Sequence, residues 1–247
     1  MSFSVTVLGS SGMFQTLDRA CAGYLLQIDG ANLWLDAGAG TWQNLLRSID
    51  YADLDGVLLT HGHPDHTTDV LQAYHARRYG QAEALDPIPL WAPHETLDRL
   101  TMFAKGIDEA FDLKAITGDD EISFRGANLT FVEMAHPEPT LGVRVELGGT
   151  VAAFSSDTGE AADFETLAGG ADLFVCEATS QESDDLWEGH LRASQAARIA
   201  QQVKVKRLVL THLRPGRDHS TTLAEAQAAA PGLSIDLAAD GMRLELA

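Results

Sequence analysis

The chain has 247 residues, of which 45% are hydrophobic and 21% charged, and its formal net charge is −19. This length is enough for a sizeable core, and we expect residues 1–247 to form a single domain. The acidic balance argues against broad affinity for nucleic acid, because that affinity depends on Lys and Arg side chains that neutralise phosphates. The acidic balance does not exclude the binding of small anionic ligands.

The sequence also indicates a protein that does not enter a membrane. No run of about 18 apolar residues occurs, and the segment from Met1 to Val5 lacks a basic region before an apolar one. We therefore expect a cytoplasmic location. The two cysteines, Cys21 and Cys176, are too few for a disulfide framework. Cys176 follows the apolar run 173–175, so we expect it to fill the core.

Short apolar segments alternate with helical patterns along the chain, which predicts α/β layering. The predicted strands are 5–8, 24–28, 33–35, 57–59, 141–147, 151–154, 173–175 and 208–211. The predicted helices are 42–49, 68–79, 94–103, 194–202 and 223–229. Asp29-Gly30 lies between two predicted strands and indicates a hairpin turn.

One loop concentrates side chains that bind metals. The predicted strand 57–59 is followed, after Thr60, by His61-Gly62-His63-Pro64-Asp65-His66. Imidazole and carboxylate groups are ligands of borderline divalent metals. Four such groups in six residues, beside Gly and Pro, suit neither a core strand nor an amphipathic helix. The block therefore predicts a metal site.

Three isolated residues, His136, Asp157 and His212, are expected to complete this site. A lone His at a strand end is more often a surface or hydrogen-bonded residue than a ligand. The block from His61 to His66 makes a ligand role the expected one, because a metal held by one loop needs further ligands from others.

In their order along the chain, these residues resemble the motifs of the metallo-β-lactamase superfamily. The resemblance runs from Val5 to about Glu245. Asp36 matches the first motif, the block from His61 to His66 the second, His136 the third, Asp157 the fourth and His212 the fifth. The resemblance implies a four-layer αββα sandwich in the α/β class. Two similar pentapeptides, 57–61 and 208–212, also suggest two related halves.

Within the superfamily the chain is most similar to the ribonuclease Z-like phosphodiesterase branch. Ser-x-Asp-Thr around Asp157 is similar to that branch's fourth motif, and Gly189-His190 resembles a later element. Cys176-Glu177-Ala178-Thr179 is close to its His-Glu-Ala-Thr box, with Cys176 in the His position. Class B β-lactamases are more distant, because Asp157 stands where they usually carry Cys.

The resemblance implies two divalent metal ions, with zinc expected and manganese or iron as alternatives. One ion would be held by His61, His63 and His136. The other would be held by Asp65, His66 and His212. Asp157 would bridge both ions, which together would activate a bridging water as a hydroxide nucleophile.

Three further residues receive roles from the same resemblance. His190 would be the general acid or a phosphate contact, and Glu177 would orient it. Asp36 would support the histidine loop from outside the ligand shell. Asp65, His190 and Glu177 are thus the expected catalytic residues. His75 and His219 are expected at the surface, and His94 at a helix start.

The spacing between motifs bears on the substrate. His136 and Asp157 are 21 residues apart, and a predicted hairpin occupies most of that interval. This leaves no room for the arm with which ribonuclease Z grips tRNA. We therefore expect hydrolysis of a small anionic phosphodiester, such as a cyclic nucleotide, rather than tRNA cleavage.

Three other interpretations stay open at this point. They are ribonuclease Z-like RNA processing, hydrolysis of carboxylic esters, lactones or thioesters, and a metal-dependent binding module without turnover. Dimers are common in the family, so a homodimer is a further expectation, although no segment of the sequence specifies an interface.

Overall fold

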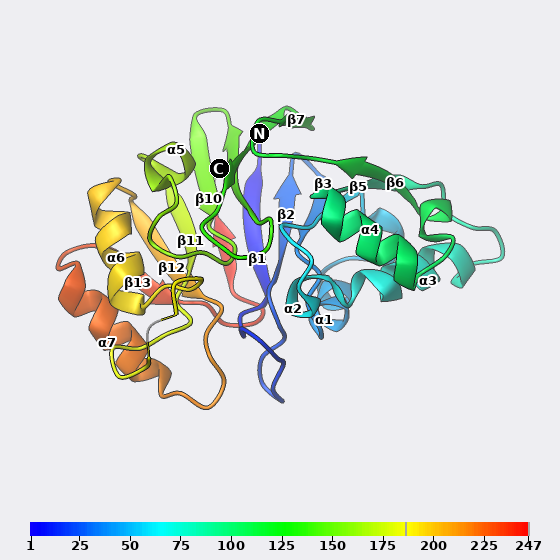
Figure 1. Ribbon diagram of the computed structural model, residues 1–247. Coiled ribbons are helices and arrows are strands. Elements are labelled where there is room, and N and C mark those ends of the chain that lie inside the picture. Colours follow the sequence, from blue (N-terminus) through cyan, green and yellow to red (C-terminus); the bar gives the residue numbers. More distant parts are fainter. Residues whose placement is uncertain (186, 247) are drawn as a thin grey trace.

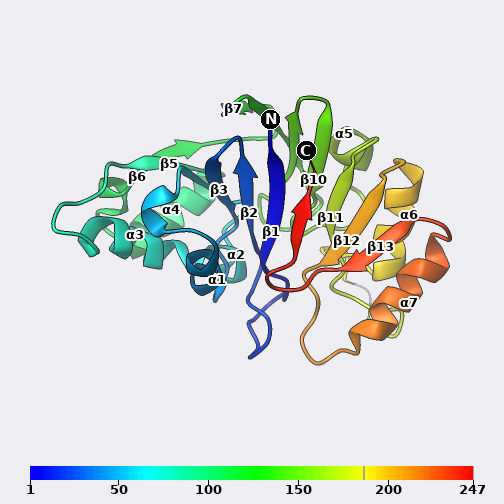
Figure 2. The same ribbon diagram turned by 180° about the vertical axis from the view of Figure 1, so that it is seen from behind.

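The computed structural model describes residues 1–185 and 187–246. Within these ranges the chain forms two seven-stranded sheets that pack face to face (Figures 1 and 2). The first sheet has the order β14-β1-β2-β3-β4-β5-β6, with bounds Arg243–Glu245, Phe3–Gly9, Gly23–Ile28, Ala31–Leu35, Gly56–Leu58, Ile88–Ala92 and Phe111–Ala115. The second has the order β13-β12-β11-β10-β9-β8-β7, with bounds Ser234–Leu237, Arg207–Thr211, Leu173–Glu177, Thr150–Phe154, Leu141–Leu147, Ala127–Glu133 and Glu121–Phe124.

Helices cover the outer face of each sheet (Figure 1). On the first sheet they are α1 (Thr41–Ser48), α2 (Pro64–Thr67), α3 (Val70–Tyr79) and α4 (His94–Phe103). On the second they are α5 (Phe164–Ala168), α6 (Ala193–Gln202) and α7 (His219–Ala229). The result is the αββα sandwich that the sequence predicted. No helix in the described ranges is long and apolar enough to cross a membrane.

Apolar side chains form the layers between these elements. Between the sheets, Phe3 and Tyr24 of the first sheet belong to the same buried cluster as Phe154 of the second. Trp34, on the opposite face of β3, packs with Leu45 of α1. Because both faces of the inner strands are covered, β1 and β3 are buried along their whole length.

Both sheets show the same succession of strand pairings: three antiparallel pairs are followed by three parallel pairs. Counted from β14 in the first sheet and from β7 in the second, β4 corresponds to β11, and β5 corresponds to β12. The two similar pentapeptides lie at the ends of β4 and β12, which are therefore not equivalent strands. The relation between two halves stays a prediction.

The predicted elements differ from the observed ones mainly at their ends. The predicted helix 68–79 is α3, which begins at Val70, and the short helix α2 that precedes it was not predicted. The last helix begins at His219 rather than at residue 223, because the Asp218 side chain accepts a hydrogen bond from the Ser220 amide and caps it. Strands β5 to β8, β13 and β14 were not predicted.

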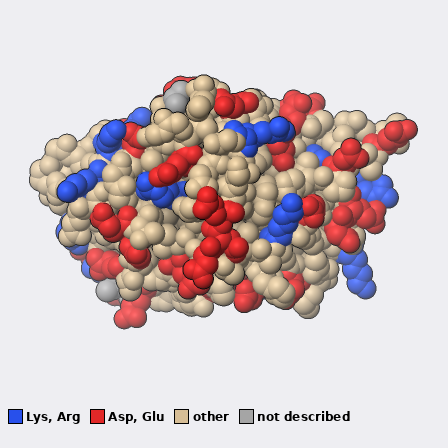
Figure 3. Space-filling model, turned by 90° about the horizontal axis from the view of Figure 1, so that it is seen from above, with Lys and Arg blue, Asp and Glu red and all other residues tan. Residues whose placement is uncertain are grey.

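Charge is distributed rather than concentrated on the face seen in Figure 3, which views the molecule from the end where both termini lie. Acidic and basic side chains are interspersed there. The functional residues follow the carboxyl ends of strands, Asp36 after β3, His61 after β4, Asp157 after β10 and His212 after β12. Ligand sites in α/β sheets are commonly formed at such strand ends.

Candidate metal centre

The local structure after β4 presents the histidine block to one site. His63 is the N-cap residue of α2, and Pro64 occupies the first helical turn, where its lack of an N–H costs nothing. Asp65 and His66 therefore lie in that first turn, directly beside His63. Gly38 allows this turn to approach, since a Cβ at residue 38 would lie 2.0 Å from the Asp65 carbonyl oxygen.

Two site residues have strained backbone. Asp36 and His212 have φ of 56° and 53°, in the left-handed region that residues with a Cβ rarely adopt. Each stands immediately after its strand, and each side chain is buried. Strain of this kind persists where the surroundings fix a conformation, often at functional sites.

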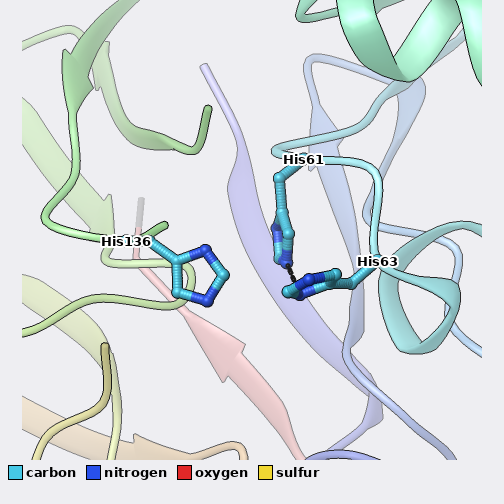
Figure 4. Close-up of side chains that lie close together, drawn as sticks. All are labelled: His61, His63 and His136. Carbon is cyan, nitrogen blue, oxygen red and sulfur yellow. Dashed lines mark hydrogen bonds between the residues drawn. The ribbon is translucent and has the colours of Figure 1, made fainter. Parts of the chain in front are cut away.

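The first predicted ligand group is assembled in the structure. Ligand-type atoms of His61, His63 and His136 all lie within 4.8 Å of one another. Figure 4 shows the three rings converging from two loops, with His61 Nε2 and His63 Nδ1 3.1 Å apart. His136 follows β8, so the second sheet supplies one member of a group that begins on the first.

The second group is assembled beside it. Asp65, His66 and His212 also lie within 4.8 Å of one another. Asp157 lies between the groups: its carboxylate is 3.6 Å from His61 Nε2 and 3.3 Å from Nε2 of both His66 and His212. The structure thus brings together all seven residues predicted as metal ligands. His75, His94 and His219 belong to none of the groups found in the described ranges.

Three threonine hydroxyls each fix the orientation of one of these imidazoles. Nδ1 of His61 lies 3.1 Å from the Thr60 hydroxyl, which donates its own proton to Asp36. In the same way Nδ1 of His136 lies 3.2 Å from Thr140 Oγ1. Because each hydroxyl donates elsewhere, it accepts from the ring, and Nε2 is left as a lone pair that faces the site.

The third such pair joins the metal centre to the His190 region. His212 Nδ1 lies 2.7 Å from Thr179 Oγ1, and that hydroxyl donates to Glu177 Oε2 at 2.7 Å. The role of these threonines was not predicted from the sequence. A hydroxyl residue beside a motif is too common to be a signal, and only the fold shows which hydroxyl meets which ring.

The orientation of His63 is fixed through its other ring nitrogen. Its Nε2 lies 3.0 Å from Glu138 Oε2, and Glu138 is itself paired with Arg99 of α4. This leaves Nδ1 of His63 as the lone pair that faces Nε2 of His61. Two lone pairs at this separation repel unless a cation lies between or beside them. Glu138 was also not predicted.

Unpartnered buried atoms test whether a metal fits here. Among the described residues, Nε2 of His66, Nε2 of His136 and Oδ1 of Asp157 are buried without a hydrogen-bond partner. Buried polar atoms are nearly always satisfied, so each exception calls for a partner such as an ion. Imidazole nitrogens and carboxylate oxygens are the donor set of zinc and similar divalent metals. The residues fit two divalent cations.

The electrostatics of the site favour the metal-binding protonation states of Asp157, His61 and His136, whereas burial of His66 is outweighed by the carboxylates of Asp157 and Asp36, which raise its pKa. Burial raises the pKa of the Asp157 carboxyl, but the neighbouring His212 and His66 outweigh it and hold that pKa well below the usual range. Burial lowers the pKa of His61 well below 6.5 and also lowers the pKa of His136. An anionic carboxylate and neutral imidazoles are the protonation states that bind metals.

His190 and Glu177 form a buried pair at the edge of the centre. His190 Nδ1 lies 2.8 Å from Glu177 Oε1, and Glu177 also accepts from the Thr158 and Leu191 amides. The pKa of His190 is lowered by burial, but the Glu177 carboxylate outweighs that effect and raises it. The His190 ring lies 5.2 Å from that of His212. The pair can therefore deliver a proton beside the metal site.

Asp36 and Cys176 lie where the sequence predicted. Asp36 accepts from the Thr60 amide at 2.8 Å and lies 2.8 Å from His66 Nδ1, so it supports two parts of the histidine loop. Cys176 is buried in the apolar layer beneath the helices of the second sheet. Burial raises the pKa of its thiol, which keeps it neutral.

The fold and this donor set define a known class of protein. The family model of the beta-lactamase superfamily domain matches residues 31–213. The chain therefore belongs to the beta-lactamase superfamily, as a metal-dependent hydrolase with the metallo-β-lactamase fold. The family predicted from the motifs is confirmed.

Particular relatives extend this result. The chain is 34% identical over 242 residues to the uncharacterized protein Rv1339 of Mycobacterium tuberculosis, covering 92% of this chain and 87% of that protein. It is 30% identical over 299 residues to ribonuclease Z of Thermobifida fusca, covering 96% and 93%. The crystal structure of the metallo-beta-lactamase fold protein YhfI from Bacillus subtilis matches with a TM-score of 0.91 at 24% identity, covering 99% and 100%.

Proposed function

We propose that this protein is a phosphodiesterase that hydrolyses a small phosphodiester, such as a cyclic nucleotide, with two divalent cations, for which zinc is the expected metal. The observation that carries the proposal is the Glu177–His190 pair at 2.8 Å beside the seven-residue metal centre. Phosphodiester hydrolysis requires a proton for the leaving alkoxide, and this pair provides a positioned donor. A cytoplasmic location remains the expectation from the sequence.

The metals would occupy the two groups already described. His61, His63 and His136 would hold one cation, and Asp65, His66 and His212 the other, with Asp157 between them. When bound, two such cations lower the pKa of a water molecule and stabilise charge on the phosphoryl oxygens.

The protein's own residues would do the rest. Threonine hydroxyls and Asp36 keep the imidazole rings in the tautomer that binds a cation. Glu177 would hold His190 protonated, and the His190 ring would donate its Nε2 proton to the departing oxygen. Because Glu177 is buried and accepts from three backbone amides, it fixes the position of that donor.

The short interval between the third and fourth motifs, from His136 to Asp157, supports a small substrate. β9 and β10 occupy residues 141–154 of the interval between His136 and Asp157. The match to the Thermobifida ribonuclease Z spans 299 aligned positions, whereas 96% of this chain is about 237 residues. About 60 aligned positions thus have no counterpart in this chain. With a net charge of −19, the chain is poorly suited to grip a long RNA.

The test is turnover of purified protein supplied with zinc or manganese. We expect hydrolysis of bis-p-nitrophenyl phosphate and of cyclic AMP, and no activity in Asp65→Ala. Asp98→Ala is the matched control, because Asp98 is an exposed carboxylate on α4 whose neighbour is His94. Full activity of Asp65→Ala would contradict the mechanism.

A substrate panel separates the alternatives. Faster hydrolysis of lactones or thioesters than of phosphodiesters would replace the proposed reaction while keeping the metal centre. RNA processing is the second candidate, favoured by the 30% identity to a ribonuclease Z. Cleavage of a precursor tRNA at a rate above that of cyclic AMP would support it instead.

A further inference from the structure

An apolar cavity opens beside the metal centre and is not used by the chemistry above. Its volume is about 590 Å³, within the range of small-molecule sites. His136, a candidate metal ligand, forms one wall, Met134, Pro137, Ala161 and Trp187 supply apolar surface, and Glu188 adds a carboxylate to the lining. A group attached to a phosphate held at the metal centre would therefore reach this cavity directly.

Trp187 is the distinctive wall of this cavity. It is 49% exposed, which is unusual for so large an apolar side chain. Its ring centroid lies 4.8 Å from that of His190 and 5.8 Å from that of His136. The ring thus contacts both the proposed proton donor and a proposed ligand while it keeps a surface free.

The backbone is shaped to hold this indole in place. A Cβ at residue 189 would lie 2.6 Å from Cη2 of the Trp187 ring, so the ring lies against the backbone of Gly189 at a distance that only glycine allows. The Trp187 carbonyl accepts a hydrogen bond from the His190 amide, which closes the turn between them. The position of the ring is therefore coupled to that of His190.

We propose that this cavity is a base subsite, in which Trp187 stacks on the nucleobase of a nucleotide whose phosphate lies at the metal centre. The proposal rests on the proposed phosphodiesterase function and names the substrate class as a nucleotide. Stacking on an indole suits any planar base, since every base has a π-face. The mostly apolar lining and the Glu188 carboxylate disfavour a second phosphate there, and a ribose is the natural spacer between the phosphate and the stacked ring.

The test uses binding rather than turnover. Adenosine 5′-monophosphate, adenosine and ribose 5-phosphate are titrated into metal-loaded protein while tryptophan emission and binding heat are followed. Trp34 and Trp91 are buried and Trp42 is half-buried on α1, so Trp187 is the exposed reporter. We expect adenosine 5′-monophosphate and adenosine to quench emission and ribose 5-phosphate to bind without quenching.

Variants assign the effect to the ring. In Trp187→Leu we expect the Kd of adenosine 5′-monophosphate to rise about tenfold or more, and the Kd of ribose 5-phosphate to change less than about twofold. Trp187→Phe keeps a stacking face and should restore most of the affinity. Tyr79→Leu is the control, because Tyr79 is an exposed aromatic residue at the end of α3.

Two results would overturn the base subsite. One is an equal loss of affinity for both phosphates in Trp187→Leu, which would show that the ring only supports His136 and His190. The other is equal affinity of the wild-type protein for adenosine 5′-monophosphate and ribose 5-phosphate. Trp187-dependent binding of adenosine without any phosphodiester turnover would support the subsite and contradict only the proposed function.

Discussion

Asp36 Oδ2 lies 2.8 Å from Nδ1 of His66, and both side chains are buried. The same carboxylate accepts the amide and the hydroxyl of Thr60, which in turn accepts from His61. One residue outside the ligand groups therefore orients two proposed ligands.

We expect Asp36→Asn to fold but to bind metal 10- to 100-fold more weakly, the usual cost of losing such a partner. The amide keeps the shape of the side chain but has only one accepting oxygen for three donors. Competition with a chromogenic chelator gives the affinity, and circular dichroism checks the fold. Wild-type metal affinity in this variant would show that Asp36 is dispensable for the site.

Metal removal should destabilise the protein as well as inactivate it. A cation that binds only the folded chain stabilises it by about 4 kcal/mol when present at about 1,000 times its Kd. For a chain of this size we expect chelation to lower Tm by about 10 °C, and added zinc to restore it. Asp157→Ala should lose this response to zinc. If neither chelator nor zinc changed the Tm, the clustered side chains would not bind a cation.

The effect of removing His190 should depend on the leaving group. We expect His190→Ala to lower kcat by about 10²- to 10⁴-fold for an alkoxide leaving group. For p-nitrophenolate, which departs without a proton, the loss should be under about tenfold. Glu177→Gln should show the same pattern more weakly, since it weakens the partner that orients His190. Equal losses for both leaving groups would assign His190 to phosphate binding.

The sequence predicted the proposed metal ligands better than the residues that hydrogen-bond to them. His61, Asp157 and His212 could be placed because each follows an apolar run that ends a predicted strand, and His136 because the order of all four matches a family. Their partners could not, because the fold decides which distant segments meet: Thr179 and His212 are 33 residues apart.

Among the strands, too, some could be predicted from the sequence and others could not. Strands with long apolar runs, such as β1 and β9, were predicted near their observed bounds. The edge strand β7 was missed because only one of its four residues is buried, which leaves little hydrophobic pattern. Trp187 carried no sequence signal, since its exposure is known only from the structure.

Both thiols, those of Cys21 and Cys176, should be inert in the folded protein. Burial, with a smaller contribution from Asp65, raises the pKa of Cys21 to about 12, and burial also raises the pKa of Cys176. At pH 8 neither thiol forms an appreciable amount of the reactive thiolate. We therefore expect a disulfide reagent to modify no thiol in native protein and both thiols in denaturant. Ser48→Cys provides an exposed thiol on α1 as the positive control. Rapid native modification of Cys176 with loss of turnover would instead give that position a part in the chemistry.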